Sequence, residues 1–266
     1  SDKLGGQFNL AKVIPGKEEY GETIRYFQKM MEKYKVNVQL NHRVTAEELK
    51  SAHYDETILA NGIIPRNLEI PGADHPKVVS YINVLNGKAD VGKKVAIVGA
   101  GGIGFDVAEY LSHQHHDEDA ILAFLKEWGV DQEYKIAGAI QRPDPSPSAR
   151  EIFLLKRSTG KHGASLGKTT GWIHKASLAA KQVKMLSDVQ YEKIDDAGFH
   201  IDIKGEKHIL DVDNVVVCAG QLSSRSLYEE LTHAGVQAHL IGGAHEAAEL
   251  DAKSAIHQAC TLAAEL

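Results

Sequence analysis

A glycine-rich turn between a predicted strand and a predicted helix carries the clearest chemistry in the sequence. The β-branched run at 95–98 leads directly into Gly-Ala-Gly-Gly-Ile-Gly, and Val107, Ala108 and Leu111 follow at helical spacing. In such a fingerprint the first glycine permits a tight turn, the second lets the backbone approach a pyrophosphate, and the third allows close packing of helix on strand. Free N–H groups and the positive end of the helix dipole then face the phosphates. The residues expected to hold a dinucleotide are Gly99, Ala100, Gly101, Gly102, Ile103 and Gly104.

The end of the next strand decides which dinucleotide binds, because an acidic side chain there would hold a ribose 2′-hydroxyl. Counting about 20 residues from Gly99 leads to the acidic run at 117–119, which would indicate NAD. No predicted strand leads into that run, however. The next predicted strand, at 151–157, ends in Lys156 and Arg157 without a carboxylate. Cationic side chains suit a 2′-phosphate, so this pair favours NADPH over NADH; the alternative is a solvated strand end.

Strand and helix patterns alternate around the turn, which indicates an α/β fold. Residues 113–150 break this alternation and form an insertion with a short apolar helix around 121–128. Upstream of the turn we expect a helix at 17–35, an alternating strand at 36–40, a helix opened by the capping box of Thr45 and Glu48, and a buried strand at 57–60. Downstream we expect a helix at 171–181, a strand at 183–186, a hairpin around 196–198, a strand at 212–220 and a final helix at about 250–265.

Two similar segments indicate how the domains are connected. Residues 57–66 (TILANGIIPR) and 215–224 (VVVCAGQLSS) are both apolar strands that end in small-residue turns. In flavoproteins with two nucleotide domains, such turns carry the chain from one domain to the other. We therefore expect one nucleotide-binding domain, containing the fingerprint, to be inserted into another domain.

Composition and charge exclude several classes of function. The 266 residues carry a net charge of −6, so no basic nucleic-acid-binding surface is expected, and no apolar stretch approaches the ~20 residues of a membrane span. The two cysteines, Cys218 and Cys260, form neither a disulfide framework nor a cysteine-ligated iron–sulfur cluster. We expect a reduced, cytoplasmic protein. His113, His115 and His116 lie in a polar stretch, which favours a solvated loop over a metal site.

Seven segments, in this order, resemble the bacterial NADPH-dependent 2,4-dienoyl-CoA reductases. They are LGGQFNLAKVIPGKEEY, ILANGIIPR, DHPKVVSYINVL, VAIVGAGGIGFDVAEYL, SLGKTTGWIH, VVVCAGQ and HLIGGAHEAAELDAKSAI, and they extend over essentially the whole chain. The family consists of flavoproteins fused to an old-yellow-enzyme-type barrel and is related to trimethylamine dehydrogenase. The resemblance implies a Rossmann-like fold with two dinucleotide-binding domains. An FAD-binding domain would comprise 1–72 and 221–266, and an NADPH-binding domain would comprise 73–220 with its insertion at 113–150.

Members of this family begin with parts that the present sequence lacks. A (β/α)8 barrel carries FMN, a 4Fe-4S cluster and the dienoyl-CoA site, and the first βαβ unit of the FAD domain follows it. We therefore expect the chain to be a C-terminal portion whose FAD site is incomplete and whose partner is the missing barrel. The family's catalytic acid lies in that barrel, so neither a catalytic residue nor a metal ligand is expected here.

The resemblance also implies particular cofactor contacts. Ala219 and Gly220, after the strand at 212–220, would join the NADPH site. The family usually has Ala-Thr-Gly at 60–62, where this sequence has Ala-Asn-Gly and so keeps a polar side chain. The retained FAD half, with the helix after Leu250, would consist of Gly5, Gly6, Gln7, Val44, Ala60, Asn61, Gly62, Gly242 and Gly243.

The implied activity is that of an oxidoreductase in which a hydride passes from nicotinamide C4 to flavin N5. Electrons would then pass through the cluster and FMN to 2,4-dienoyl-CoA, in the β-oxidation of unsaturated fatty acids. The protein's task would be to place the cofactor rings in contact. Two alternatives fit the same sequence: part of an amine dehydrogenase or another old-yellow-enzyme fusion, and a nucleotide-binding module without turnover. Expected partners are the nucleotides and the barrel, with no nucleic acid and no membrane.

Overall fold

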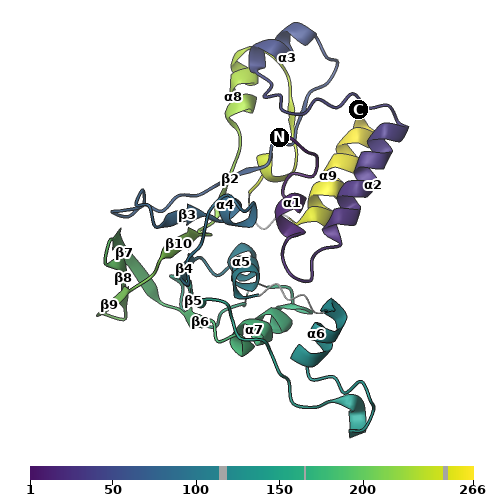
Figure 1. Ribbon diagram of the computed structural model, residues 1–266. Helices are drawn as coiled ribbons and strands as arrows, with labels where there is room; N and C mark the ends of the chain where they lie inside the picture. The colour runs from purple at the N-terminus through teal and green to yellow at the C-terminus, as the bar shows by residue number, and fades with distance from the viewer. Residues whose placement is uncertain (114–118, 165, 248–250) are drawn as a thin grey trace. The chain divides into compact units, whose positions relative to one another are not determined.

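The chain divides into two compact units (Figure 1). The computed structural model describes residues 1–113, 119–164, 166–247 and 251–266. Unit 1 comprises residues 1–4, 30–66 and 219–266, and unit 2 comprises residues 5–29 and 67–218. The domain bounds expected from the sequence stay predictions, and each unit is described here by itself.

A five-stranded parallel sheet forms the centre of unit 2, in the order β3-β10-β4-β5-β6. Four successive residues of β4 are buried, as expected for a strand covered on both faces. Val98 at the end of β4 is paired with both Leu155 and Val217, so the carboxyl ends of the three central strands meet at one edge. The strands of this sheet are β3 (Val78–Ser80), β4 (Lys94–Val98), β5 (Glu151–Leu155), β6 (Lys184–Leu186) and β10 (Asn214–Val217).

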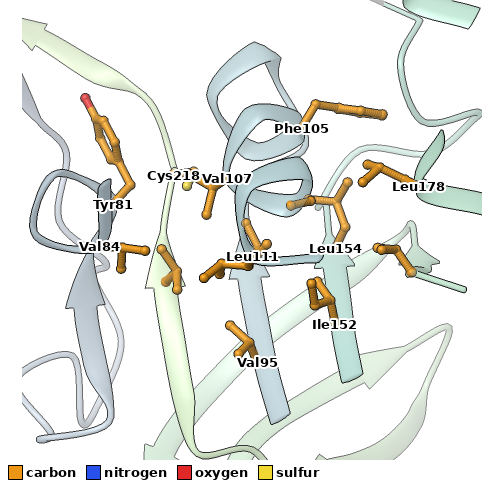
Figure 2. Packing of buried hydrophobic residues seen from close by; sticks show 14 of the residues in the cluster. Tyr81, Val84, Val95, Phe105, Val107, Leu111, Ile152, Leu154, Leu178 and Cys218 are labelled. Atoms are coloured by element: carbon orange, nitrogen blue, oxygen red, sulfur yellow. The ribbon is translucent and has the colours of Figure 1, made fainter. Parts of the chain in front are cut away.

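Helix α5 (Gly102–Ser112) packs on β4 and β5 and against α7 (Gly171–Ala180). Val107, Ala108 and Leu111 are buried, so the predicted inner side of the helix is confirmed. Figure 2 shows Val107 and Leu111 on the side of α5 that faces the strands. Each large apolar side chain buried in this cluster stabilises the folded state by about 1.5–3 kcal/mol relative to exposure. The α5–sheet contact is therefore the main apolar core of unit 2.

A second sheet of unit 2 is antiparallel, in the order β7-β8-β9. The hairpin expected around 196–198 is confirmed by β7 (Val189–Asp195) and β8 (Gly198–Ile203). The third strand, β9 (Glu206–Leu210), was not predicted from the sequence. Its residues are mostly polar and exposed, so they show no alternating apolar pattern. Other helical elements of unit 2 are α1 (Phe8–Ala11), α4 (Tyr81–Leu85) and η1 (Ala137–Ala139).

The insertion expected at 113–150 contains α6 (Ala120–Glu127), which confirms the predicted short helix. Lys181, buried just after α7, forms an ion pair of 3.0 Å with Glu127 at the end of α6. Arg150, at the other end of the insertion, donates hydrogen bonds to carbonyl oxygens in α5 and in the loop before β4. These contacts tie both the helix and the end of the insertion to the rest of unit 2.

Unit 1 consists of short strands and surface helices. Strand β1 pairs with β12 in parallel, and β2 pairs with β11 in antiparallel. The Thr45 side chain accepts a hydrogen bond from the N–H of Glu48, so the predicted N-cap is confirmed. Helix α2 (Tyr20–Lys33), also expected, begins in unit 2 and ends in unit 1. Elements of unit 1 are α3 (Ala46–Ala52), β1 (Ile58–Leu59), β2 (Ile63–Pro65), β11 (Gln221–Ser223), α8 (Ser226–His233), β12 (His239–Leu240), η2 (Gly242–Ala244) and α9 (Ala252–Glu265).

The strand predicted at 36–40 is wrong. Val36, Val38 and Leu40 are 53%, 40% and 44% exposed, and no described strand pairs with this segment. Alternating apolar and polar residues form a strand only where a neighbouring strand supplies hydrogen bonds. At the other end of unit 1, the expected final helix is confirmed as α9, while Leu250 lies outside the described residues.

Glu109 of α5, in unit 2, is a buried carboxyl group that contacts α7. Burial raises its pKa from the ordinary 4.5 to about 7. A 3.0 Å hydrogen bond donated by the Ser177 hydroxyl and the charge of Lys181 oppose this rise. His113 and His174 lie 3.9 and 3.7 Å from the carboxylate oxygens. Between about pH 4.5 and pH 7, the folded chain therefore holds a proton on Glu109 that the unfolded chain releases.

Replacing Glu109 with Gln is expected to remove a pH-dependent loss of stability. Because the folded-state pKa lies above the unfolded value, stability from this group is complete below about pH 4.5 and is lost as the pH rises through about 7. The shift corresponds to roughly 3 kcal/mol. In urea unfolding, the free energy of unfolding of E109Q should exceed that of the unaltered chain at pH 8 but not at pH 5. The exposed control E69Q should show no such gain, and an equal effect of E109Q at both pH values would contradict the assignment.

Candidate functional site

The turn after β4 has the geometry that the glycine fingerprint predicts. Gly99 has a φ of +105°, a region that residues with a Cβ rarely adopt. A Cβ on Gly104 would lie 1.8 Å from the carbonyl oxygen of Gly99, so only glycine lets α5 approach the turn this closely. A Cβ on Gly101, in contrast, would meet no atom within 4 Å. The first and third glycines are therefore required by the fold, and the second leaves open space beside the backbone.

The N-terminus of α5 presents N–H groups that have no partner within the helix. Gly101 is the N-cap residue with an extended backbone, and no side chain caps the helix. The N–H of Phe105 bonds to the Gly101 carbonyl oxygen at 3.1 Å. The N–H groups of Gly102, Ile103 and Gly104 come earlier and have no carbonyl one turn before them. Together with the helix dipole, these groups favour an anion at this position.

A cavity of about 410 Å³ lies against this turn. Its walls come from the fingerprint and from the segment that follows β5. Because β4 and β5 are parallel neighbours, both segments leave the sheet at the same edge. The described lining includes two lysines and no acidic side chain, so the cavity also favours an anion. The residues that line it are Ala100, Gly101, Lys156, Ser158, Thr159, Gly160, Lys161, Gly163 and Ala164.

Lys156 and Arg157, the pair predicted to bind a 2′-phosphate, lie in different environments. Lys156 lines the cavity, and its ammonium group donates to the carbonyl oxygens of Thr159 and Lys161, each at 3.1 Å. Arg157 is exposed and is not among the lining residues. Burial raises the pKa of Tyr191 to about 12, and the Arg157 guanidinium opposes that rise. Sequence reasoning missed Lys161, because its place beside the cavity depends on how the chain turns after β5.

His162 fastens this segment to the sheet. It is buried, and its Nε2–H donates to the carbonyl oxygen of Leu154 in β5 at 3.2 Å. Burial lowers the pKa of His162, and the nearby positive charge of Lys156 lowers it further. The imidazole is therefore neutral at pH 7, and the positive charge at the cavity comes from the lysines.

The flavin-binding residues expected in unit 1 lie on two turns that meet. A Cβ on Gly243 would lie 2.7 Å from Ile63 Cγ2 and 3.3 Å from the carbonyl carbon of Gly62. The side-chain amide of Asn61 donates to the carbonyl and hydroxyl oxygens of Ser224, at 2.9 and 3.0 Å. Asn61 thus holds the turn in place with its polar group, and glycine keeps the two turns close.

The remaining expected flavin residues are placed as follows. The N–H of Gly242 donates to the side-chain oxygen of Gln258 in α9, at 2.8 Å. Ala60 is exposed after β1, and Val44 is half-buried directly before the N-cap of α3. In unit 2, the residues Gly5, Gly6 and Gln7 precede α1, and Gln7 is its N-cap residue. The N–H of Gly242 is therefore already engaged by the protein.

Ala219 and Gly220, expected near NADPH, follow β10 and belong to unit 1. The carbonyl oxygen of Gly220 accepts a hydrogen bond from the N–H of Arg66 at 3.0 Å. This bond lies next to the register of β2 and β11, where Pro65 pairs with Gln221. The two similar segments noted in the sequence are thus joined as an antiparallel pair.

A second cavity, of about 380 Å³, lies in unit 1 between β12 and α9. None of the expected flavin residues lines it. The N-terminus of α9 is capped by Asp251, whose carboxylate accepts the N–H of Ser254 at 2.7 Å. That carboxylate takes the place at which a phosphate would bind. The cavity is lined by His239, Leu240, Ile241, His245, His257, Gln258, Thr261, Leu262 and Glu265.

The part of the chain that the structure describes holds no group of three or more His, Cys, Asp or Glu side chains placed to bind a metal ion. His113 is described at the end of α5, whereas His115 and His116 lie outside the described residues. The same described ranges contain no helix with the length and apolarity needed to cross a membrane. Cys218 and Cys260 are both free thiols.

Comparison with known proteins identifies the family. Residues 2–244 match the family described as pyridine nucleotide-disulphide oxidoreductase. The chain belongs to this family. The predicted α/β, Rossmann-like fold of an FAD- and NAD(P)-binding oxidoreductase is therefore confirmed, and family membership accounts for the glycine turn at the carboxyl edge of a parallel sheet.

Two curated relatives extend over most of the chain. A metal reductase of Desulforamulus reducens is 27% identical over 263 residues, which are 97% of this chain and 38% of the relative. A cinnamate reductase of Clostridium sporogenes is 27% identical over 243 residues, which are 91% of this chain and 31% of the relative. The chain thus spans less than two fifths of the length of either relative.

The fold is also similar to that of a solved enzyme. A 2-naphthoyl-CoA reductase in complex with 2-naphthoyl-CoA has a TM-score of 0.76 and 24% sequence identity to this chain. The similarity covers 97% of this chain and 34% of that one. At this identity the likeness supports the fold.

Replacing Gly104 with Ala is expected to destabilise the chain severely. The new Cβ would lie 1.8 Å from the carbonyl oxygen of Gly99, whose own N–H is bonded to Leu155 of β5 at 2.9 Å. We expect a loss of at least about 3 kcal/mol, the upper end of ordinary overpacking. Thermal unfolding followed by circular dichroism measures the effect. Gly21→Ala, at an open position of α2, is the matched control and should keep or raise stability. Equal midpoints for both variants would show that α5 does not need this close approach.

Proposed function

We propose that this chain binds NADPH in the cavity beside the fingerprint and delivers its hydride to FAD within a larger reductase. The cavity itself carries the proposal. Gly101, which is the N-cap residue of α5 and has an open Cβ position, lines the same cavity of about 410 Å³ as two lysines. Membership in a family of pyridine nucleotide oxidoreductases supports the same ligand.

The charges around the cavity favour NADPH over NADH. NADPH carries two anionic groups, its pyrophosphate and its 2′-phosphate. The N–H groups of Gly102, Ile103 and Gly104 suit the pyrophosphate, and the lysine-bearing segment after β5 suits the 2′-phosphate. An acidic side chain, which would hold a free 2′-hydroxyl, is absent from the described lining.

Two glycine-containing turns of unit 1 would lie beside the flavin. Gly62 and Gly243 bring two backbones together without side chains between them, and the hydrogen bonds from Asn61 to Ser224 fix one of these turns. When bound, FAD accepts the hydride of NADPH and passes electrons onward. The chain's own residues bind and orient the two cofactors, and no side chain is assigned as a general acid or base.

The electron acceptor we propose is a conjugated acyl thioester of the 2,4-dienoyl-CoA type. Seven segments of the sequence resemble enzymes that reduce such thioesters, and two similar proteins are named as reductases of cinnamate and of 2-naphthoyl-CoA. The acceptor site, FMN and a 4Fe-4S cluster would lie in a barrel outside this chain. Unsaturated fatty acid metabolism would be the setting, with the barrel as partner.

Nucleotide binding is tested on the 266-residue chain by calorimetric titration with NADPH. We expect Gly101→Val to weaken binding by roughly tenfold, because overfilling a close-fitting site costs about 1–3 kcal/mol. The backbone of Gly101 is extended and its Cβ position is open, so the variant should still fold; its thermal midpoint should fall only slightly, because valine is a poorer N-cap residue than glycine. Gly21→Val is the matched control and should bind as the unaltered chain does. If the unaltered chain binds no pyridine nucleotide, the proposal is wrong.

The acceptor is tested with the protein expressed from its whole native reading frame. We expect NADPH oxidation, followed at 340 nm, to be driven by 2,4-hexadienoyl-CoA and not by saturated hexanoyl-CoA. Trimethylamine and histamine with an artificial electron acceptor form the comparison arm. Turnover of an amine without turnover of the dienoyl thioester would replace the proposed acceptor with an amine substrate.

A further inference from the structure

The segment between β5 and α7 is fastened to unit 2 along its first half. The backbone of Lys156 exchanges hydrogen bonds with β6 and β7, at 3.0 and 3.1 Å. The carbonyl oxygen of Ser158 accepts the N–H of Asp188 at 3.3 Å. Buried His162 bonds to β5 further along. The chain from 156 to 162 is therefore held at both ends, and its side chains have defined places around the cavity.

The ammonium group of Lys156 faces into this turn. Two of its three N–H donors are directed to the carbonyl oxygens of Thr159 and Lys161. The turn thus wraps around the ammonium, and the two carbonyl dipoles offset part of its charge. A lysine whose ammonium group is bonded in this way stabilises the turn and is not free to move toward a ligand. Its main effect is to place the residues that it holds.

Lys161 has the opposite environment. Its carbonyl oxygen is held by Lys156, but its side chain is exposed and lines the cavity. Among the described residues, none forms an ion pair or hydrogen bond with its ammonium group. The hydroxyl-bearing residues Ser158 and Thr159 line the same cavity. An exposed ammonium group without a protein partner, beside two hydroxyl-bearing residues, is a suitable receptor for a phosphate group.

We propose that Lys161 is the specificity residue that meets the 2′-phosphate of NADPH, and that Lys156 is a positioning residue that holds Lys161 in place. This inference rests on the proposed NADPH site and refines it. Arg157, which the sequence analysis assigned to the 2′-phosphate together with Lys156, is not among the residues that line the cavity. Its guanidinium lies near Tyr191 instead.

Titration of the 266-residue chain with NADPH and NADH tests the role of Lys161. Lys161→Gln should weaken NADPH binding by about tenfold, the effect of losing one charge-assisted hydrogen bond, and leave NADH binding unchanged. Adenosine 2′,5′-bisphosphate should lose affinity in parallel, and adenosine 5′-monophosphate should not. Lys168→Gln is the matched control, because Lys168 is an exposed lysine of the same segment outside the cavity lining. It should leave all four affinities unchanged.

A double-mutant cycle tests the role of Lys156. Lys156→Met should also weaken NADPH binding selectively, and Lys156→Met with Lys161→Gln should bind no more weakly than the weaker single variant. If Lys156 served only the stability of the fold, the two losses would add and NADH would be affected as much as NADPH. Lys156→Arg, which still donates to both carbonyl oxygens, should restore most of the affinity.

Several outcomes would overturn this assignment. Equal loss of NADPH and NADH in Lys161→Gln would place Lys161 on a part common to both nucleotides. A selective loss in Arg157→Gln but not in Lys161→Gln would return the role to Arg157. Either result would leave the proposed NADPH site standing. Failure of the unaltered chain to bind any pyridine nucleotide would instead overturn the proposed function, and this inference with it.

Discussion

The close approach of α5 to the turn after β4 is the constraint on which unit 2 depends. Gly104 lies against the carbonyl oxygen of Gly99 at a separation that no Cβ tolerates. Because the helix starts this close to the strand, its N-terminus lies at the carboxyl edge of the sheet. Its inner side, with Val107 and Leu111, then falls on β4 and β5. One steric requirement therefore positions the core and the anion-binding end of the helix together.

The parallel sheet adds the second half of the cavity. Since β4 and β5 end side by side, the segment after β5 faces the fingerprint, and its lysines bring positive charge to an edge that already favours anions. Within that segment the two lysines have separate tasks in our proposal. Lys156 is occupied by backbone carbonyl oxygens, and Lys161 remains available to a ligand. Local shape thus decides which of two neighbouring cations meets the phosphate.

Unit 1 is organised differently, because polar groups of its turns and of the α9 N-terminus already have hydrogen-bond partners within the protein. Gln258 occupies the N–H of Gly242, Ser224 occupies the amide of Asn61, and Asp251 caps α9. What these turns offer a flavin is therefore mainly close backbone approach and little charge. In the enzyme we propose, the phosphates of FAD would be held by groups outside these turns. This agrees with a chain that spans less than two fifths of its curated relatives.

The sequence by itself determined the α/β class, the fingerprint and the buried side of α5, because strand and helix periods and a run of glycines are local patterns. It did not determine β9, whose residues are mostly polar and exposed, or the unpaired state of 36–40, which depends on what lies beside it. Nor did it separate Lys156 from Arg157 or reveal Lys161. Only the tertiary structure decided where these residues lie, because the path of the chain after β5 is set by hydrogen bonds from distant residues such as Asp188 and by the turn that they hold.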